Sequence, residues 1–307
     1  MIFLAAEHFV RAPQWTWYIL FYFFFAGIGG GSYVLATLLR VAGDARDEPA
    51  ARIGFYLSLP AILICPILLT ADLGASWSRF WHMLVDTTPG ETSLNFKYGS
   101  PMSVGVWALL VFGFFVGISA LDTWSRDRGG RPDGLLGASL GRAFNIVGSL
   151  LGLFVASYTG VLLSVTNQPV WSDTWALGGL FLASGLSGAA AAITLLVRYR
   201  PDASRSLDRL RQADAYFSIL EFAMLVAFFV TVAFAGTAGR ILPWLPLWIL
   251  ALIGIGASMI GIRRPARVET SGQSAAMAPV AMEATVISVL VLVAVLAMRA
   301  AVIFSAQ

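Results

Sequence analysis

Residues 55–69 read FYLSLPAILICPILL, an apolar run long enough to cross most of a lipid bilayer. The rest of the chain repeats this pattern, since 58% of its residues are hydrophobic, only 12% are charged, and apolar runs of about 20 residues recur along it. We therefore predict a multi-pass protein of the inner (cytoplasmic) membrane. Its eight spans are expected at residues 15–40, 53–71, 101–122, 142–166, 174–198, 214–236, 242–262 and 279–303.

The spans are predicted to be helices. The bilayer core offers no partners to backbone polar groups, and the apolar runs lack the period-two alternation of a barrel strand. The fold class is then an all-α membrane bundle without a soluble domain. The longest connection, at roughly residues 72–100, has room for only a short interfacial helix.

The distribution of cations predicts the orientation. Fifteen of the 20 lysine and arginine residues flank the connections after the first, third, fifth and seventh spans, and short cytoplasmic loops carry such an excess. Both termini and the connection from Asp72 to Pro101 are therefore expected outside. The net charge of +3 then reflects membrane topology. It does not indicate nucleic-acid binding, because the sequence offers no soluble module with a basic, aromatic-rich patch.

The sequence also contains a candidate internal repeat, which would make two four-helix bundles of residues 1–170 and 171–307. Chance identity between apolar helices explains the match equally well. Glycines at positions 27 and 29–31 predict close helix packing rather than a dinucleotide site. At an offset of 157 residues, Phe24, Ala26, Gly31, Thr37, Leu38 and Leu39 match Phe181, Ala183, Gly188, Thr194, Leu195 and Leu196.

Few residues could bind a metal centre. Cys65 is the only cysteine, whereas an iron–sulfur cluster needs about four thiolates. The two histidines, His8 and His82, both lie in outer flanking segments, which argues against a bis-histidine haem. We therefore expect no haem, cluster or other metal in this chain, and interpret Cys65 as a small core residue.

Polar residues at the membrane edge or inside it are functional candidates, because their burial is costly. The outer edge of the first half carries Tyr22, Asp72, Arg79, His82, Lys97, Ser100, Ser103, Tyr158 and Asn167, and the inner half carries Asp122, Asn145, Glu221 and Glu283. Structural alternatives exist. Asp122 is well explained as a solvated helix end beside Arg126, and the two glutamates as interface residues that snorkel.

Three ordered motifs then resemble the NrfD-like family, the quinone-reactive membrane subunits of polysulfide-reductase-type oxidoreductases. They are DLG at 72–74 followed by RFWHML at 79–84, YGSPMSVGVW at 98–107, and SYTGVLL at 157–163. The likeness extends over the whole chain. Eight spans, outward termini, the pair Trp15 and Trp17, and a glycine-rich first span agree with it.

The resemblance implies a division of labour. A catalytic subunit, commonly a molybdopterin enzyme, would pass electrons through an iron–sulfur subunit docked on the outer face. The present chain would bind a quinone, either menaquinone or ubiquinone, and exchange electrons with it as part of a respiratory oxidoreductase complex. The sequence leaves open the direction of electron flow and whether protons are translocated.

Quinone chemistry suggests roles for the polar residues. His82 can exchange protons near neutral pH, Asp72 can accept or relay them, and Tyr158 can donate a hydrogen bond. The remaining expected pocket residues are Tyr22, Arg79, Ser100, Ser103 and Asn167, and the candidate proton route contains Glu221, Glu283 and Asp122. In the family, a histidine on the first span contributes to the pocket. The matching stretch here has none, and Tyr22 is its expected substitute.

Other interpretations stay open. Asp72 could pair locally with Arg79, which would leave His82 as an interfacial residue only. A secondary transporter could also use parallel repeats and buried acids, although the sequence offers no matched pair of short, interrupted spans. A passive membrane anchor would need no pocket at all.

Overall fold

The computed structural model describes residues 10–74, 76–90, 93–128, 134–261 and 277–307, with the backbone only for residues 260–261 and 277–283. Eight helices in these residues are long and apolar enough to cross a membrane. This confirms the predicted eight-span, all-helical membrane fold. They are α1 (Trp17–Val41), α2 (Glu48–Asp72), α3 (Pro101–Asp127), α4 (Ala138–Ser164), α5 (Leu177–Val197), α6 (Leu207–Phe234), α7 (Leu245–Gly261) and α8 (Met277–Phe304).

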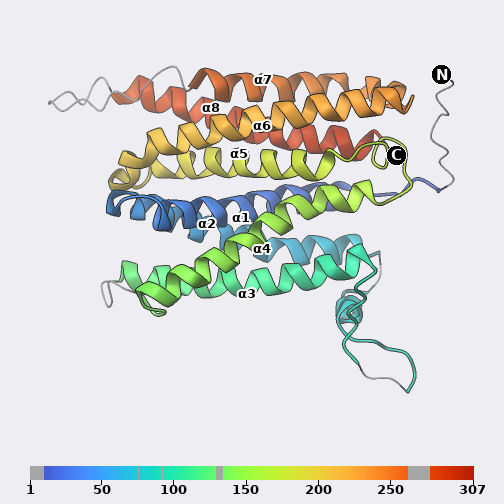
Figure 1. Cartoon of the computed structure of the whole chain (residues 1–307), viewed down its shortest axis with the longest axis horizontal. Coiled ribbons are helices and arrows are strands. Elements are labelled where there is room, and N and C mark those ends of the chain that lie inside the picture. Colours follow the sequence, from blue (N-terminus) through green and yellow to red (C-terminus); the bar gives the residue numbers. More distant parts are fainter. Residues whose placement is uncertain (1–9, 75, 91–92, 129–133, 262–276) are drawn as a thin grey trace.

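The eight helices lie side by side along the long axis of the molecule (Figure 1). Helices α1 to α4 pack on their neighbours in sequence order, and α4 returns to α1. Helices α5 to α8 pack in the same cyclic order, and α5 joins the two groups through α1 and α4. On this basis we propose that residues 1–170 and 171–307 form two four-helix units.

Glycines permit the close approach of the central helices. A Cβ atom on Gly30 would come within 2.5 Å of the Gly152 carbonyl oxygen of α4, and one on Gly31 within 2.6 Å of the Gly185 carbonyl oxygen of α5. Such distances exclude a side chain without movement of the backbone. The predicted close packing of the glycine-rich first span is therefore confirmed.

Arg299 is fully buried where α1, α5 and α8 meet. Its Nη1 donates to the Phe23 carbonyl oxygen at 3.0 Å, and its Nη2 donates to the Phe181 carbonyl oxygen at 2.9 Å and to Ser184 Oγ at 3.0 Å. Arg299 therefore lies inside the bundle, where carbonyl and hydroxyl oxygens of two neighbouring helices accept its hydrogen bonds.

The arginine-rich end of the bundle is held together by ion pairs. Arg40 Nη2 lies 2.8 Å from Glu48 Oε1, and Arg52 Nη1 lies 2.7 Å from Asp127 Oδ1. These pairs link α1, α2 and α3. Several cations that predict topology therefore also fix how the helix ends sit against one another.

The opposite end carries the long connection between α2 and α3, which leaves the bundle sideways (Figure 1). It contains the 3₁₀-helix η2 (Trp77–Met83) and an isolated antiparallel bridge between Val85 and Leu94. The connection thus holds one short helix among its described residues, in keeping with the limited room that the sequence predicts. The start of α1 and the end of α8 lie at this same end.

Candidate functional site

Two buried tyrosines and a cysteine meet inside the first unit, toward the end that carries the long connection. Tyr22 of α1 and Cys65 of α2 are both buried, and the Cys65 sulfur lies 4.0 Å from the Tyr22 carbonyl oxygen. Tyr158 of α4 lies within electrostatic range of the Tyr22 phenol. The Tyr22 hydroxyl has no hydrogen-bond partner among the described residues. A buried phenol of this kind is an available donor in an apolar wall.

Tyr158 is wedged against the start of α3. Its hydroxyl donates to the Pro101 carbonyl oxygen at 2.5 Å, and its ring stacks on Phe154 with centroids 5.6 Å apart. Gly105 makes room for the ring, because a Cβ atom at that position would overlap it. The Tyr158 proton is therefore already used within the protein.

Ser100 and Ser103 hold the beginning of α3. The Ser100 side chain caps the helix by accepting from the Ser103 backbone N–H at 3.4 Å. Ser103 Oγ donates to the Asn95 carbonyl oxygen at 3.2 Å and accepts from the Lys97 backbone N–H at 3.0 Å. Both serines flank Pro101, whose carbonyl oxygen accepts from Tyr158. Their hydrogen bonds order the connection that precedes α3.

Asn95, which sequence reasoning missed, ties the long connection to the bundle. Its Nδ2 donates to the His82 carbonyl oxygen at 3.0 Å, while its own carbonyl accepts from Ser103 and from Trp107 Nε1 at 3.2 Å. Its Oδ1 is buried without a partner. A polar residue inside an otherwise apolar stretch, Leu94–Phe96, is the only signal in the sequence that points to it.

His82 lies on η2 and is half-buried. Its ring packs edge-to-face on Trp81, with centroids 4.4 Å apart. The imidazole nitrogens have no hydrogen-bond partner in the described part of the chain, so they are available to a ligand. Arg79, on the same 3₁₀-helix, is exposed and makes no ion pair with any described residue.

Asp72 ends α2 and joins it to the start of α1. Its Oδ1 accepts from Thr16 Oγ1 at 2.8 Å, and Thr16 also caps α1 by accepting from the Tyr18 backbone N–H at 3.3 Å. The local partner of Asp72 is thus Thr16, not Arg79. Threonine immediately before an apolar run is an N-cap signal that could have identified Thr16. Asn167 lies half-buried just beyond α4.

The acidic residues away from this site differ in their surroundings. Asp122 is buried at the arginine-rich end and accepts from Arg126 Nε at 3.0 Å and from the backbone N–H groups of Leu135 and Leu136 at 2.7 and 3.1 Å. These bonds hold the connection between α3 and α4. The Glu283 side chain lies outside the described residues.

Glu221 belongs to a row of polar groups inside the second unit. Asp214, Ser218 and Glu221 follow one face of α6 at positions i, i+4 and i+7. Ser187 Oγ of α5 donates to Asp214 Oδ1 at 2.6 Å and lies 3.2 Å from Ser218 Oγ. Glu221 is buried and interacts electrostatically with Arg299. Sequence reasoning identified Glu221 but missed Asp214, although their helical spacing was a readable signal.

The described residues contain no group of three or more histidine, cysteine, aspartate or glutamate side chains arranged to hold a metal ion. The polar groups at the end of the first unit that carries the long connection are instead hydrogen-bond donors and acceptors. Tyr22 and His82 have free capacity, Tyr158 and the serines are engaged, and Asp72 keeps a carboxylate oxygen beyond its bond to Thr16. This set suits a ligand that accepts hydrogen bonds and exchanges protons.

Comparison with known proteins yields a family match over nearly the whole chain. The family described as "Polysulphide reductase, NrfD" matches residues 6–307. The C component of polysulfide reductase from Wolinella succinogenes is 28% identical over 194 residues, which cover 59% of this chain and 57% of that protein. Protein NrfD of Escherichia coli is 27% identical over 257 residues, covering 77% and 76%. The C component of selenate reductase from Mesobacillus selenatarsenatis is 24% identical over 111 residues, covering 36% and 23%.

Proposed function

Because this chain belongs to the polysulphide reductase NrfD family of membrane subunits, we propose that it binds quinone or quinol for a multisubunit respiratory oxidoreductase. An iron–sulfur subunit on the outer face would exchange electrons with that quinone, and a molybdopterin subunit would act on the soluble substrate. Two of the relatives are by name components of a polysulfide reductase and a selenate reductase, which supports a place in such a complex.

The unpaired Tyr22 hydroxyl is the observation that carries the proposal. The Tyr22 side chain is only 5% exposed, and its hydroxyl donates to no described residue, so its proton is available to a ligand. Quinone interconverts with quinol by taking up two electrons and two protons, and its carbonyl oxygens accept hydrogen bonds. A donor in an apolar wall therefore fits a quinone ring. The half-buried imidazole of His82 adds a second group with free nitrogens.

The other residues would support this pair. His82 would exchange protons with the ligand, and Asp72, through its free carboxylate oxygen, would relay them to the outer water. Tyr158 would shape the pocket and hold the start of α3, since its proton is committed to Pro101. Ser100, Ser103 and Asn167 would order the surrounding connections. Arg79, being exposed, would face the docked partner instead of the ring.

For a proton route, Glu221 is the best suited of the three candidate acids. It is buried in a row of polar side chains, whereas Asp122 is saturated by Arg126 and two backbone N–H groups. Asp214 and Ser218 would extend the route from Glu221 toward the arginine-rich end. Glu283, at the start of α8, stays in the proposal on its sequence position alone.

The complex purified through this chain tests the function. We expect copurified quinone, a redox partner that carries iron–sulfur clusters, and turnover with added quinol or quinone. Solute flux in proteoliposomes without redox partners would instead indicate a secondary transporter. Absence of both quinone and flux, in a complex that keeps activity with an artificial dye, would leave a passive anchor.

A further inference from the structure

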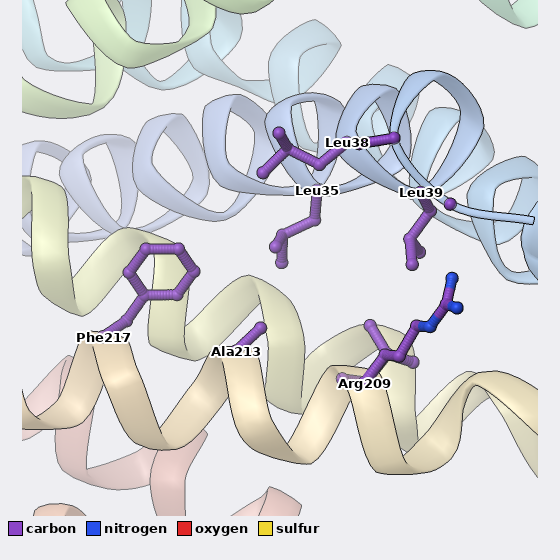
Figure 2. Close-up of a pocket in the computed structure, with 9 residues that line it drawn as sticks. Leu35, Leu38, Leu39, Arg209, Ala213 and Phe217 are labelled. Carbon is purple, nitrogen blue, oxygen red and sulfur yellow. The ribbon is translucent and has the colours of Figure 1, made fainter.

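A groove opens between α1 and α6 near the arginine-rich end of the bundle. Its volume is about 250 Å³. Leu35 and Leu39 of α1 face Ala213 and Phe217 of α6 across it, and Arg209 stands at its mouth (Figure 2). Neither the family match nor the proposed quinone site, which lies toward the other end of the first unit, accounts for this groove.

The groove exists because the two units do not pack equally on both sides. On one side α2 packs against α5 as well as against α1, and a Cβ atom on Gly54 would lie 3.2 Å from Ile193 Cδ1 of α5 and 2.8 Å from Ala36 Cβ of α1. On the other side α1 and α6 have no comparable packing among the described residues. Beyond the groove, the connection between α1 and α2 is joined to the start of α6, where Asp47 accepts from Ser206 Oγ at 2.8 Å and from Arg209.

The lining is suited to a hydrocarbon tail. Leucine, alanine and phenylalanine side chains form the walls, and Leu38 at the rim is 50% exposed. In a membrane this rim faces lipid tails, because it lies on a spanning helix a turn from its end. Each methylene group of an acyl tail that is buried in the groove favours binding of the lipid. A narrow apolar groove beside the headgroup level fits the upper part of such a tail.

The mouth of the groove carries exposed Arg209, which pairs with exposed Asp44 and with buried Asp47. Arg209 Nη2 lies 2.7 Å from Asp44 Oδ2, and the two side chains are 48% and 70% exposed. A phosphate would be attracted to Arg209 and a primary ammonium to Asp44. A purely anionic headgroup would meet both Asp44 and Asp47, which makes it a poorer match.

We propose that this groove binds one phospholipid whose headgroup carries a phosphate and a primary ammonium, of the phosphatidylethanolamine type. One acyl tail lies between α1 and α6, the phosphate contacts Arg209, and the ammonium contacts Asp44. The lipid thereby fills the side on which the two units lack direct helix packing.

Native mass spectrometry of the full-length protein, washed in detergent and offered defined lipids, tests the proposal. Phosphatidylethanolamine, phosphatidylcholine and phosphatidylglycerol are the probes. We expect one retained phosphatidylethanolamine, preferred over phosphatidylcholine by about two- to fivefold, as for an exposed ion pair. Ala213→Phe, which fills the groove, should reduce retention about tenfold, equivalent to roughly two methylene contacts. Ile219→Phe, on the exposed side of α6, is the matched control and should retain the lipid.

Asp44→Asn separates headgroup recognition from acyl-tail binding. It should remove the preference for phosphatidylethanolamine while the total retained lipid stays within about twofold of wild type. Leu38→Trp, at the half-exposed rim, repeats the blocking test without a change in the buried wall. Equal retention of all three lipids, a preference for phosphatidylglycerol, a retained quinone in place of lipid, or unchanged retention in folded Ala213→Phe and Leu38→Trp proteins would each overturn the proposal.

Discussion

Tyr22 and Tyr158 show at the scale of single residues how one side-chain type can serve different ends. The Tyr158 hydroxyl is bound to Pro101, whereas the Tyr22 hydroxyl has no partner in the described part of the chain. Removal of a hydroxyl that makes a hydrogen bond within the protein lowers the stability of the fold. Removal of a hydroxyl without a partner does not lower stability, so stability measurements on phenylalanine variants distinguish the two tyrosines.

We predict that Tyr22→Phe leaves the stability of the purified protein unchanged or slightly raised but lowers quinone-linked turnover about five- to tenfold, the value of one hydrogen bond. Tyr33→Phe is the control. Tyr33 is also buried in α1, but its hydroxyl bonds Ser119 Oγ at 2.7 Å, so its loss should cost about 1 kcal/mol of stability and leave turnover alone. Thermal unfolding and quinol oxidation rates, measured on the same samples, distinguish the outcomes. Full turnover in Tyr22→Phe would remove this tyrosine from the site.

A second prediction concerns proton exchange by His82 and Asp72. His82→Ala should lower quinone-linked turnover about tenfold or more, as expected for loss of a general acid or base, with dye activity of the soluble partner retained. Asp72→Asn can still accept the Thr16 hydrogen bond, so any fall in turnover would report the lost carboxylate and not a lost cap. Steady-state kinetics with quinol and with dye provide both readouts. Normal quinone turnover in both variants would refute the assigned roles.

At the scale of helices, the glycines of α1 decide how closely the central helices pack. Gly30→Ala should destabilise the protein by about 1–3 kcal/mol, because the new methyl group would meet the Gly152 carbonyl oxygen. Gly117→Ala in α3 has open space around its position and should be neutral or stabilising by up to about 1 kcal/mol. Unfolding in a graded detergent mixture compares them. Equal stability of the two variants would contradict the packing argument.

The polar face of α6 yields a prediction about protons. If Glu221 carries them, Glu221→Gln should reduce the number of protons translocated per electron more than it reduces uncoupled electron transfer. Asp202→Asn, at an exposed acid ahead of the start of α6, is the control. Proteoliposomes with simultaneous recording of quinone turnover and proton movement give the ratio. An unchanged ratio in a fully assembled Glu221→Gln complex would leave this glutamate as a structural partner of Arg299.

The helices could be predicted from sequence because hydropathy is a local property. Their ends could not be placed as well, since α2 begins at Glu48 and α6 at Leu207, in both cases ahead of the apolar run. The charged residues in these first turns form ion pairs with other helices, as Glu48 does with Arg40 of α1. The site residues Tyr22, Asp72 and His82 were readable as polar groups in apolar surroundings. Thr16 and Asn95 each left a weak local signal, but their pairing with Asp72 and His82 was not readable, because only the fold brings these residues together.

At the scale of the whole molecule, the orientation remains a prediction from the arginine distribution. A reporter fused after Arg205 should be cytoplasmic, and one inserted at the exposed Gly90 of the long connection should be external. Phosphatase and fluorescent-protein fusions, active on opposite sides of the membrane, test both positions. Reversal of either result would move the proposed quinone site, and the partner that docks beside it, to the other face.

The burial of Arg299 has a consequence for biogenesis. An arginine within a span costs up to about 3 kcal/mol when the translocon releases that span into lipid. The oxygens that offset this cost, from Phe23, Phe181 and Ser184, belong to α1 and α5, which the ribosome delivers long before α8. The donors of Arg299 are therefore satisfied only when α8 docks on these two helices, so an α8 that has not docked leaves its charge in the membrane without these partners.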